Sequence, residues 1–346
     1  MNSRIIPLLA CVISILASCD KVEKTTNDKA VSSFKPYVKI IDEEGHQVID
    51  ENAEVEILAG GFNWTEGPLC LPDGNFIFSD IPENKIYQWS QEKGVEEYLK
   101  PSGTTGYLKD SYTSGSNGLL LSPNNELVLC QHGDRRVAIM NASLSNPSPD
   151  YTTLVDNYQG KRLNSPNDAV YHSNGDLYFT DPPYGLDEYE KDPKKELDFQ
   201  GVYRLKPDGQ LDLLVSDLKF PNGIGLSKNE KTLYVANSDY DNIVWMAYDL
   251  DENGLVKSGT VFYDANKYLN TEDRGNPDGL EVNKQGYVLA TGPGGLWIFN
   301  ENGKELARVY TGQLTSNCAL STDEKYIYMT ADDYIMRVKL KSGKNE

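Results

Sequence analysis

The chain has 346 residues, with 52 acidic and 33 basic side chains and a formal net charge of −19 at pH 7. This charge argues against a nucleic-acid partner and against binding to anionic lipid through a basic surface. The 22 tyrosines, and the lack of any long stretch with helical periodicity, favour β structure.

The first segment is typical of a bacterial lipoprotein signal. Arg4 precedes an apolar run from Ile5 to Ala17, which is too short to span a bilayer as a mature helix. The run leads into Leu-Ala-Ser-Cys at residues 16–19, a lipobox in which the cysteine is acylated. We therefore expect a signal peptide over residues 1–18, lipidation at Cys19, and an extracytoplasmic, membrane-anchored lipoprotein in the periplasm or at the cell surface. An ordinary cleaved signal that happens to contain a cysteine is the alternative.

Residues 19–35 are expected to form a flexible tether, because the stretch after Cys19 is polar and has few bulky apolar side chains. The remainder, residues 36–346, is expected to be one domain. That is long for a single core, but a repeated architecture distributes its burial over the repeats.

A short unit recurs six times within this domain. Each copy opens with an oxygen-bearing side chain, continues through a short apolar stretch, and after a turn reaches a second apolar run. The opening residues, here called the anchors, are Glu66, Asn117, Asn167, Asn222, Asp278 and Asn317. The second runs are Phe76–Phe78, Leu127–Leu129, Leu177–Phe179, Leu233–Val235, Tyr287–Leu289 and Tyr326–Tyr328. Repetition at about 40 to 55 residues with strand and turn signals predicts an all-β, six-bladed β-propeller.

Too few residues follow Asn317 to build a full four-stranded blade. We expect Ala53–Ala59 to supply the missing strand, so that an N-terminal strand closes the ring and removes a sheet edge. The longest irregular insertion, Asp181–Gln200, is either a lid over the axial mouth or a solvated excursion.

Three cysteines remain in the domain: Cys70, Cys130 and Cys318. Each lies in or beside an apolar strand, and their spacing fits no thiolate metal motif. We expect them to be buried and free, while a Cys70–Cys318 disulfide is left open.

Because the anchors occupy one position in each repeat, we expect their side-chain oxygens to converge on the central axis. A set of carboxylate and amide oxygens selects calcium, magnesium or manganese over zinc or copper. The alternative is that these Asn-Gly and Asp-Gly pairs are simple turns. Glutamate is a poor turn residue, so Glu66 favours a site.

Several motifs resemble those of the senescence marker protein/gluconolactonase (regucalcin-like) lactonase family. They are Trp64–Pro68, Cys130–Val137, Ser165–Asp168, Phe179–Gly185, Phe220–Gly223 and Asn276–Gly279. The resemblance covers roughly residues 55 to 340. It implies a six-bladed propeller that binds a divalent cation, often calcium, and hydrolyses sugar lactones.

The resemblance also implies roles for individual residues. Glu66, Asn222 and Asp278 match the family's metal ligands, and Asp278 matches the ligand that doubles as acid and base. Asn167 matches a residue that contacts the substrate or a metal-bound water, and Asn117 and His132 match pocket residues of the gluconolactonase-like branch. The regucalcin branch has an arginine where this chain has Ser165, and Arg162 is the nearest candidate to replace it in sugar binding.

We therefore expect a sugar lactonase that depends on a divalent cation, calcium foremost, with magnesium, manganese or zinc as alternatives. The cation would polarise the lactone carbonyl, and Asp278 would act as general base and then as proton donor to the ring oxygen. A non-catalytic propeller that binds a carbohydrate or protein partner, and a hydrolase of non-sugar lactones, are the alternatives. The chain has no Gly-x-Ser-x-Gly motif, which argues against a serine esterase.

Overall fold

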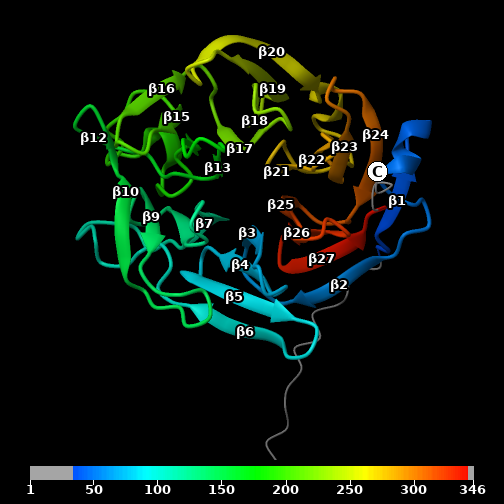
Figure 1. The fold of residues 1–346 in the computed structure, drawn as a ribbon, viewed down its shortest axis with the longest axis horizontal. Helices are drawn as coiled ribbons and strands as arrows, with labels where there is room; N and C mark the ends of the chain where they lie inside the picture. The colour runs from blue at the N-terminus through cyan, green and yellow to red at the C-terminus, as the bar shows by residue number, and fades with distance from the viewer. Residues whose placement is uncertain (1–33, 342–346) are drawn as a thin grey trace, which may run out of the picture. The chain divides into compact units, whose positions relative to one another are not determined.

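Six antiparallel sheets stand around a central axis in the computed structural model, which describes residues 34–341 (Figure 1). The expected all-β, six-bladed propeller is confirmed. The expected signal peptide, Cys19 and almost all of the tether lie outside the described residues.

Each sheet is one blade, and its strands pair in chain order from the axis outward, except that an N-terminal strand forms the outer edge of two blades. Blade 1 contains β3 Thr65–Cys70, β4 Phe76–Asp80, β5 Lys85–Ser90 and β6 Gly94–Leu99. Blade 2 contains β7 Ser116–Leu121, β8 Leu127–Gln131, β9 Arg136–Met140 and β10 Tyr151–Val155. Blade 3 contains β13 Ala169–Tyr171, β14 Leu177–Asp181, β15 Gly201–Leu205 and β16 Leu211–Val215.

Blade 4 contains β17 Pro221–Leu226, β18 Thr232–Asp239, β19 Asn242–Leu250 and β20 Val256–Asp264. Blade 5 contains β21 Leu280–Val282, β22 Val288–Gly292, β23 Gly295–Phe299, β24 Glu305–Tyr310 and β1 Tyr37–Ile40. Blade 6 contains β25 Thr315–Leu320, β26 Tyr326–Ala331, β27 Tyr334–Lys339 and β2 Val55–Gly60. The predicted second apolar runs fall in the second strands of the blades, except that Tyr287 directly precedes β22.

The remaining elements are short. A small hairpin pairs β11 Asn157–Tyr158 with β12 Lys161–Arg162. The 3-10 turns are η1 Glu43–Gln47, η2 Tyr189–Lys191 and η3 Asn266–Tyr268. Among residues 34–341, no helix has the length and apolar character that crossing a membrane requires.

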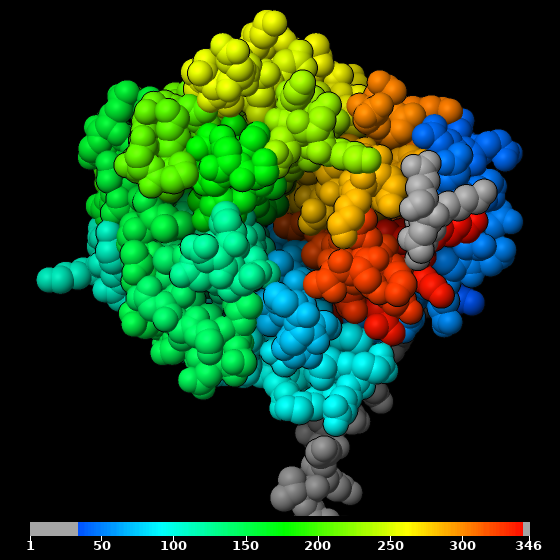
Figure 2. Space-filling model, viewed as in Figure 1, coloured from blue at the N-terminus to red at the C-terminus, as the bar shows by residue number. Residues whose placement is uncertain are grey.

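The ring is closed by an N-terminal strand, as expected. β2 pairs antiparallel with β27, and Val55 lies opposite Val338. A second N-terminal strand, β1, pairs with β24 in the neighbouring blade and was not anticipated. Figure 2 shows the consequence, because N-terminal atoms in blue pack beside C-terminal atoms in red.

Apolar side chains fill the space between consecutive blades. Six buried clusters are present among the described residues, and each draws its members from two adjacent blades. The cluster between blades 6 and 1 stacks Phe76 on Tyr328, with ring centroids 4.5 Å apart. Burial of apolar area is the main stabilising term in folding, so the closing interface is held by the same force as the others.

The three cysteines of the propeller are all free, as predicted. Cys130 and Cys318 are buried, and Cys70 is half-buried. The structure therefore contains no Cys70–Cys318 disulfide.

Candidate active site

The anchors sit where the innermost strand of each blade is irregular. In blades 1, 2, 4 and 6 the pairing register of that strand shifts at the anchor, and in blades 3 and 5 the strand begins only after it. A bulge changes the direction in which its side chain points. Five anchors line one cavity of about 830 Å³ on the axis, here called the anchor-side cavity; they are Glu66, Asn117, Asn167, Asn222 and Asp278.

The sixth anchor departs from the expectation of a single ring. Asn317 lines the cavity at the other end of the inner strands instead. Its Oδ1 accepts a hydrogen bond from the backbone N–H of Cys318 at 2.7 Å, and its Nδ2 donates to Asp168 Oδ2 at 3.4 Å. These two bonds hold the amide toward the opposite end.

Glycine after the anchor allows the blades to meet closely at the axis. A Cβ on Gly67, whose φ is +48°, would lie 1.9 Å from the carbonyl oxygen of Asn117, and one on Gly223 would lie 2.2 Å from that of Asp278. The Gly223 N–H instead donates to the Asp278 carbonyl at 3.1 Å. Such links between neighbouring blades fix the backbone of the anchors.

The amide anchors form a directional chain of hydrogen bonds across three blades. Asn117 Nδ2 donates to Asn167 Oδ1 at 2.7 Å, and Asn167 Nδ2 donates to Asn222 Oδ1 at 2.5 Å. Asn222 Nδ2 in turn donates to Ser238 Oγ at 3.0 Å. The chain leaves Asn117 Oδ1 buried without a partner, and it leaves the second lone pair of Asn222 Oδ1 available to a ligand.

His132 supports this chain. Its Nε2 lies 3.3 Å from Asn167 Oδ1, which can only accept, so Nε2 donates. Burial lowers the pKa of His132 to about 4. The imidazole is therefore neutral at neutral pH, and it orients an amide without adding charge.

Glu66 is buried and Asp278 is half-buried, and within residues 34–341 neither carboxylate pairs with a basic side chain. Glu66 accepts from the backbone N–H of Gly67 at 3.3 Å, and Asp278 Oδ1 has no hydrogen-bond partner among the described residues. Burial and the charge of Asp168 raise the pKa of Glu66 to about 8. Burial, and then the charges of Glu66 and Asp168, raise the pKa of Asp278 well above its usual value. Such a pair is stabilised by protons or by a bound cation.

The donors present fit a hard cation. They are two carboxylates and amide oxygens, with no sulfur or imidazole nitrogen aimed at the pair. Among residues 34–341 no group of three or more His, Cys, Asp or Glu side chains is placed to hold a metal, so an ion here would rely on neutral amide oxygen as well. Oxygen ligands of mixed charge are typical of calcium sites.

The structure brings most of the predicted site residues together, with one exception. Glu66, Asn117, His132, Asn167, Asn222 and Asp278 all line the anchor-side cavity. Arg162 lies in β12, where it pairs with Glu196 at 2.6 Å and Asp110 at 3.3 Å, and it does not line the cavity. The expectation that Arg162 binds sugar is not supported, because β12 holds it against the surface of the insertion.

Sequence reasoning missed several residues of the cavity rim. Arg274, on the connection between β20 and β21, is the cation that lines the cavity. The insertion Asp181–Gln200 contributes Tyr184 and Tyr189 to the same lining. Part of the insertion therefore lies at the mouth, although the segment Asp187–Lys191, which includes Tyr189, is exposed to solvent.

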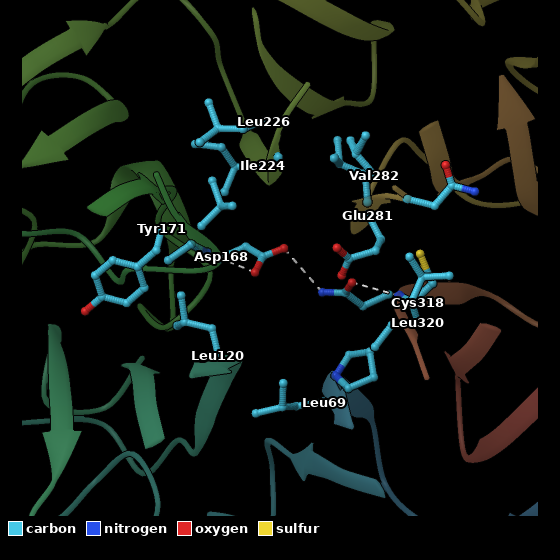
Figure 3. Close-up of a pocket in the computed structure, with 18 of the residues that line it drawn as sticks. Leu69, Leu120, Asp168, Tyr171, Ile224, Leu226, Glu281, Val282, Cys318 and Leu320 are labelled. Atoms are coloured by element: carbon cyan, nitrogen blue, oxygen red, sulfur yellow. Dashed lines mark hydrogen bonds between the residues drawn. The ribbon is translucent and has the colours of Figure 1, made fainter. Parts of the chain in front are cut away.

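The other end of the channel holds a second cavity of about 650 Å³, here called the opposite cavity (Figure 3). Apolar side chains of the inner strands contribute to its wall, among them Leu69, Leu120, Tyr171, Ile224, Leu226, Val282 and Leu320. Asp168 and Glu281 point into it from opposite sides. Burial raises the pKa of each carboxyl to about 7.

Asp168 was missed as a channel residue, although the repeat contains a signal. It follows its anchor at the position where four other copies have glycine. Its Oδ1 accepts from the backbone N–H of Ala169 at 2.9 Å. A carboxylate in a glycine position of a repeat therefore marks a side chain directed into the channel.

Comparison with known proteins gives one consistent result. The profile described as "SMP-30/Gluconolactonase/LRE-like region" matches residues 64–333. Gluconolactonase from Zymomonas mobilis is 34% identical over 343 residues, which covers 97% of this chain and 94% of that protein. Lactonase drp35 from Staphylococcus aureus is 23% identical over 275 residues, covering 79% of this chain and 77% of the relative. The solved structure of a gluconolactonase from Xanthomonas campestris has a TM-score of 0.74 at 26% identity, covering 89% of this chain and 96% of that chain.

Proposed function

Because the chain belongs to the SMP-30/gluconolactonase/LRE family and is a lactone hydrolase of that family, we propose that it opens sugar lactones in the anchor-side cavity. The observation that carries the proposal is the carboxylate pair Glu66 and Asp278 beside an ordered chain of amides. Glu66 is buried, and Asp278 Oδ1 is buried without a partner among the described residues. A pure binding surface has no need for two uncompensated carboxylates at this position, since each costs desolvation free energy.

We propose that Glu66, Asn222 and Asp278 hold a divalent cation, calcium foremost. Magnesium, manganese and zinc are the alternatives that a metal titration would separate. The bound cation would supply Lewis-acid polarisation of the lactone carbonyl and would neutralise charge that develops on its oxygen.

Asp278 is the proposed acid and base. A water attacks the carbonyl carbon and Asp278 takes its proton; the acyl–oxygen bond then breaks, and Asp278 returns the proton to the departing ring oxygen. Asn167 and Asn117 are proposed to orient the lactone and the water, because their amides are held by hydrogen bonds of 2.7 Å or less. His132 keeps the Asn167 amide in that orientation.

The test is a pH-stat screen of aldonolactones with the purified protein, before and after treatment with a chelator. We expect acid release above the spontaneous rate, loss of that rate on chelation, and recovery with calcium. If only non-sugar lactones were hydrolysed, the substrate class would be non-sugar lactones instead of sugar lactones. No hydrolysis of any lactone would favour a propeller that only binds a carbohydrate or protein partner.

We also propose that Cys19 carries a lipid that anchors the protein to a membrane on the extracytoplasmic side. Support comes from the lipobox at residues 16–19 and the apolar run before it. Cys19→Ser should abolish labelling by a radioactive fatty acid and release the protein from membranes. Label that persists in this variant would refute the assignment.

A further inference from the structure

Four aromatic side chains form a continuous row, and three of them, Tyr184, Tyr189 and Tyr240, line the anchor-side cavity. Tyr189 meets Tyr184 edge-on, with ring centroids 6.2 Å apart. Tyr184 stacks on Phe220 at 5.7 Å, and Phe220 meets Tyr240 edge-on at 6.0 Å. The row comes from the insertion after β14 and from one end of blade 4's inner pair of strands, where Phe220 precedes β17 and Tyr240 follows β18.

The outer members of this row are exposed. Tyr189 is 50% exposed and Tyr240 is 68% exposed, the largest fraction of any large apolar side chain among residues 34–341. Both line the cavity. Isolated exposed apolar residues are common, but these two flank one opening and rest on rings beneath them.

The turn that carries Tyr240 is fixed in place. Asp239 pairs with Asn242 in the hairpin of β18 and β19, so Tyr240 and Asp241 form its tip. Lys219 Nζ lies 3.1 Å from Asp239 Oδ1 and 3.5 Å from Asp241 Oδ2. Because the tip is tied down on both sides and the ring packs on Phe220, little conformational entropy remains to be lost when a ligand stacks on it.

The cavity is larger than one sugar lactone requires. A volume of about 830 Å³ is typical of pockets that enclose drug-sized ligands. Glu66 and Asp278 line this cavity together with the exposed rings of Tyr240 and Tyr189. The volume admits a second sugar ring beside the one that the carboxylates would contact.

We propose that the aromatic row is a subsite for a second sugar, and that the preferred substrate is a disaccharide lactone, that is, an aldonolactone whose further sugar ring stacks on Tyr240. The C–H groups on the apolar face of a sugar carry partial positive charge and are attracted to the negative face of an aromatic ring. This inference rests on the proposed function, since it extends the substrate of the same site.

Polar groups are available for the hydroxyls of that second ring. Arg274 is exposed and lines the cavity, and no hydrogen bond or ion pair engages its guanidinium within the part of the chain that the structure describes. Asn270 and Thr271 lie on the same connection and line the same cavity. A stacking face with hydrogen-bond donors beside it is the arrangement that a sugar ring requires, because the ring has an apolar face and a polar edge.

The test compares two lactones in one set of variants. The kcat/KM for cellobionolactone divided by that for glucono-1,5-lactone is measured for the parent, Tyr240→Ala, Tyr240→Phe and Tyr37→Ala. Tyr37 is the matched control, being 46% exposed and remote from the cavity lining. We expect Tyr240→Ala to lower the ratio about 2- to 10-fold, mainly through KM, and Tyr240→Phe and Tyr37→Ala to preserve it.

Binding is measured in parallel, so that this inference and the proposed function can fail separately. Isothermal titration with cellobionate and gluconate should give tighter binding of cellobionate in the parent and the loss of that preference in Tyr240→Ala. If the parent hydrolyses no lactone but shows this preference, the proposed function fails and the sugar subsite stands. If glucono-1,5-lactone is hydrolysed while Tyr240→Ala changes neither the ratio nor the preference, the subsite is overturned.

Discussion

Each end of the central channel carries two carboxyl groups, and burial raises the pKa of all four. The two ends are nevertheless built differently. At the anchor side, Glu66 and Asp278 lie among amide side chains held by hydrogen bonds, and Asp278 Oδ1 has no partner among the described residues. At the opposite cavity, Asp168 and Glu281 project toward each other among side chains that include Leu120, Ile224 and Val282 (Figure 3).

The difference shows that raised pKa values alone do not mark a catalytic site. Asp168 already accepts hydrogen bonds from Ala169 and Asn317, so its oxygens are largely satisfied within the fold. The anchor side has free oxygen atoms together with neutral oxygen ligands. We therefore expect a cation to bind more tightly at the anchor side than at the opposite cavity. The predictions below test this contrast.

The largest effect is expected from Asp278→Asn. The change keeps an oxygen of similar shape and removes the proposed acid and base, so turnover of an aldonolactone should fall about 10²–10⁴-fold. Metal content is measured in the same samples, because the lost charge also weakens a cation site. Glu281→Gln is the matched control at the opposite cavity, and an equal loss of turnover there would contradict the distinction between the two ends.

Glu66→Gln is expected to weaken binding of a divalent cation. Loss of a residue that only supports a ligand costs about 10–100-fold in metal affinity, so removal of a charged ligand should cost at least as much. Glu281→Gln, at the opposite cavity, should change the affinity only slightly. Calorimetric titration of calcium into demetallated protein measures the affinity of both variants. A greater loss of calcium affinity in Glu281→Gln than in Glu66→Gln would place the cation at the opposite cavity.

Asp168→Asn should stabilise the demetallated protein at alkaline pH. The pKa of Asp168 is raised from 3.8 to about 7 by burial, so between about pH 4 and pH 7 the folded state retains a proton that the unfolded state has released. Stability conferred by this group is therefore lost as pH rises through that window. Urea unfolding should show a gain of about 1–3 kcal/mol for the variant at pH 8 and little difference at pH 4. A gain that is equal at both pH values would mean that charge burial is not the cause.

His132 is expected to give the smallest effect. Since burial lowers its pKa to about 4, the pH–rate profile should show no histidine limb near pH 6.5. His132→Ala removes one neutral hydrogen bond to Asn167 and should lower turnover about 2- to 10-fold. A limb near pH 6.5 that disappears in this variant would instead assign His132 a proton-transfer role.

The repeat made the architecture predictable. Six anchors gave the number of blades, and the shortage of residues after Asn317 indicated the closing strand that the structure contains as β2. The strand β1 could not be found in this way, because Tyr37–Ile40 is short and its partner β24 is distant in the sequence.

The repeat correctly predicted the place of five of the six anchors, the exception being Asn317, which lines the opposite cavity. Residues outside the repeat could not be predicted in this way. Glu66, Asn167 and Asp278 each open a repeat, so their convergence followed from register. Arg162 was chosen because it lies near Ser165 in sequence, yet β12 carries it to Glu196. Tyr240 stands at the tip of an ordinary hairpin, and no local pattern reveals that this tip reaches the cavity.

The most direct test follows rate and metal content together during calcium titration of the demetallated protein, with glucono-1,5-lactone as substrate. If the anchor side is the single functional cation site, the rate should rise from the spontaneous value in proportion to bound calcium and reach its maximum at one ion per chain. Glu66→Gln should shift that curve to higher calcium, and Glu281→Gln should not. Full hydrolysis by the metal-free protein, or a maximum that requires an intact Glu281 but not Glu66, would contradict the account.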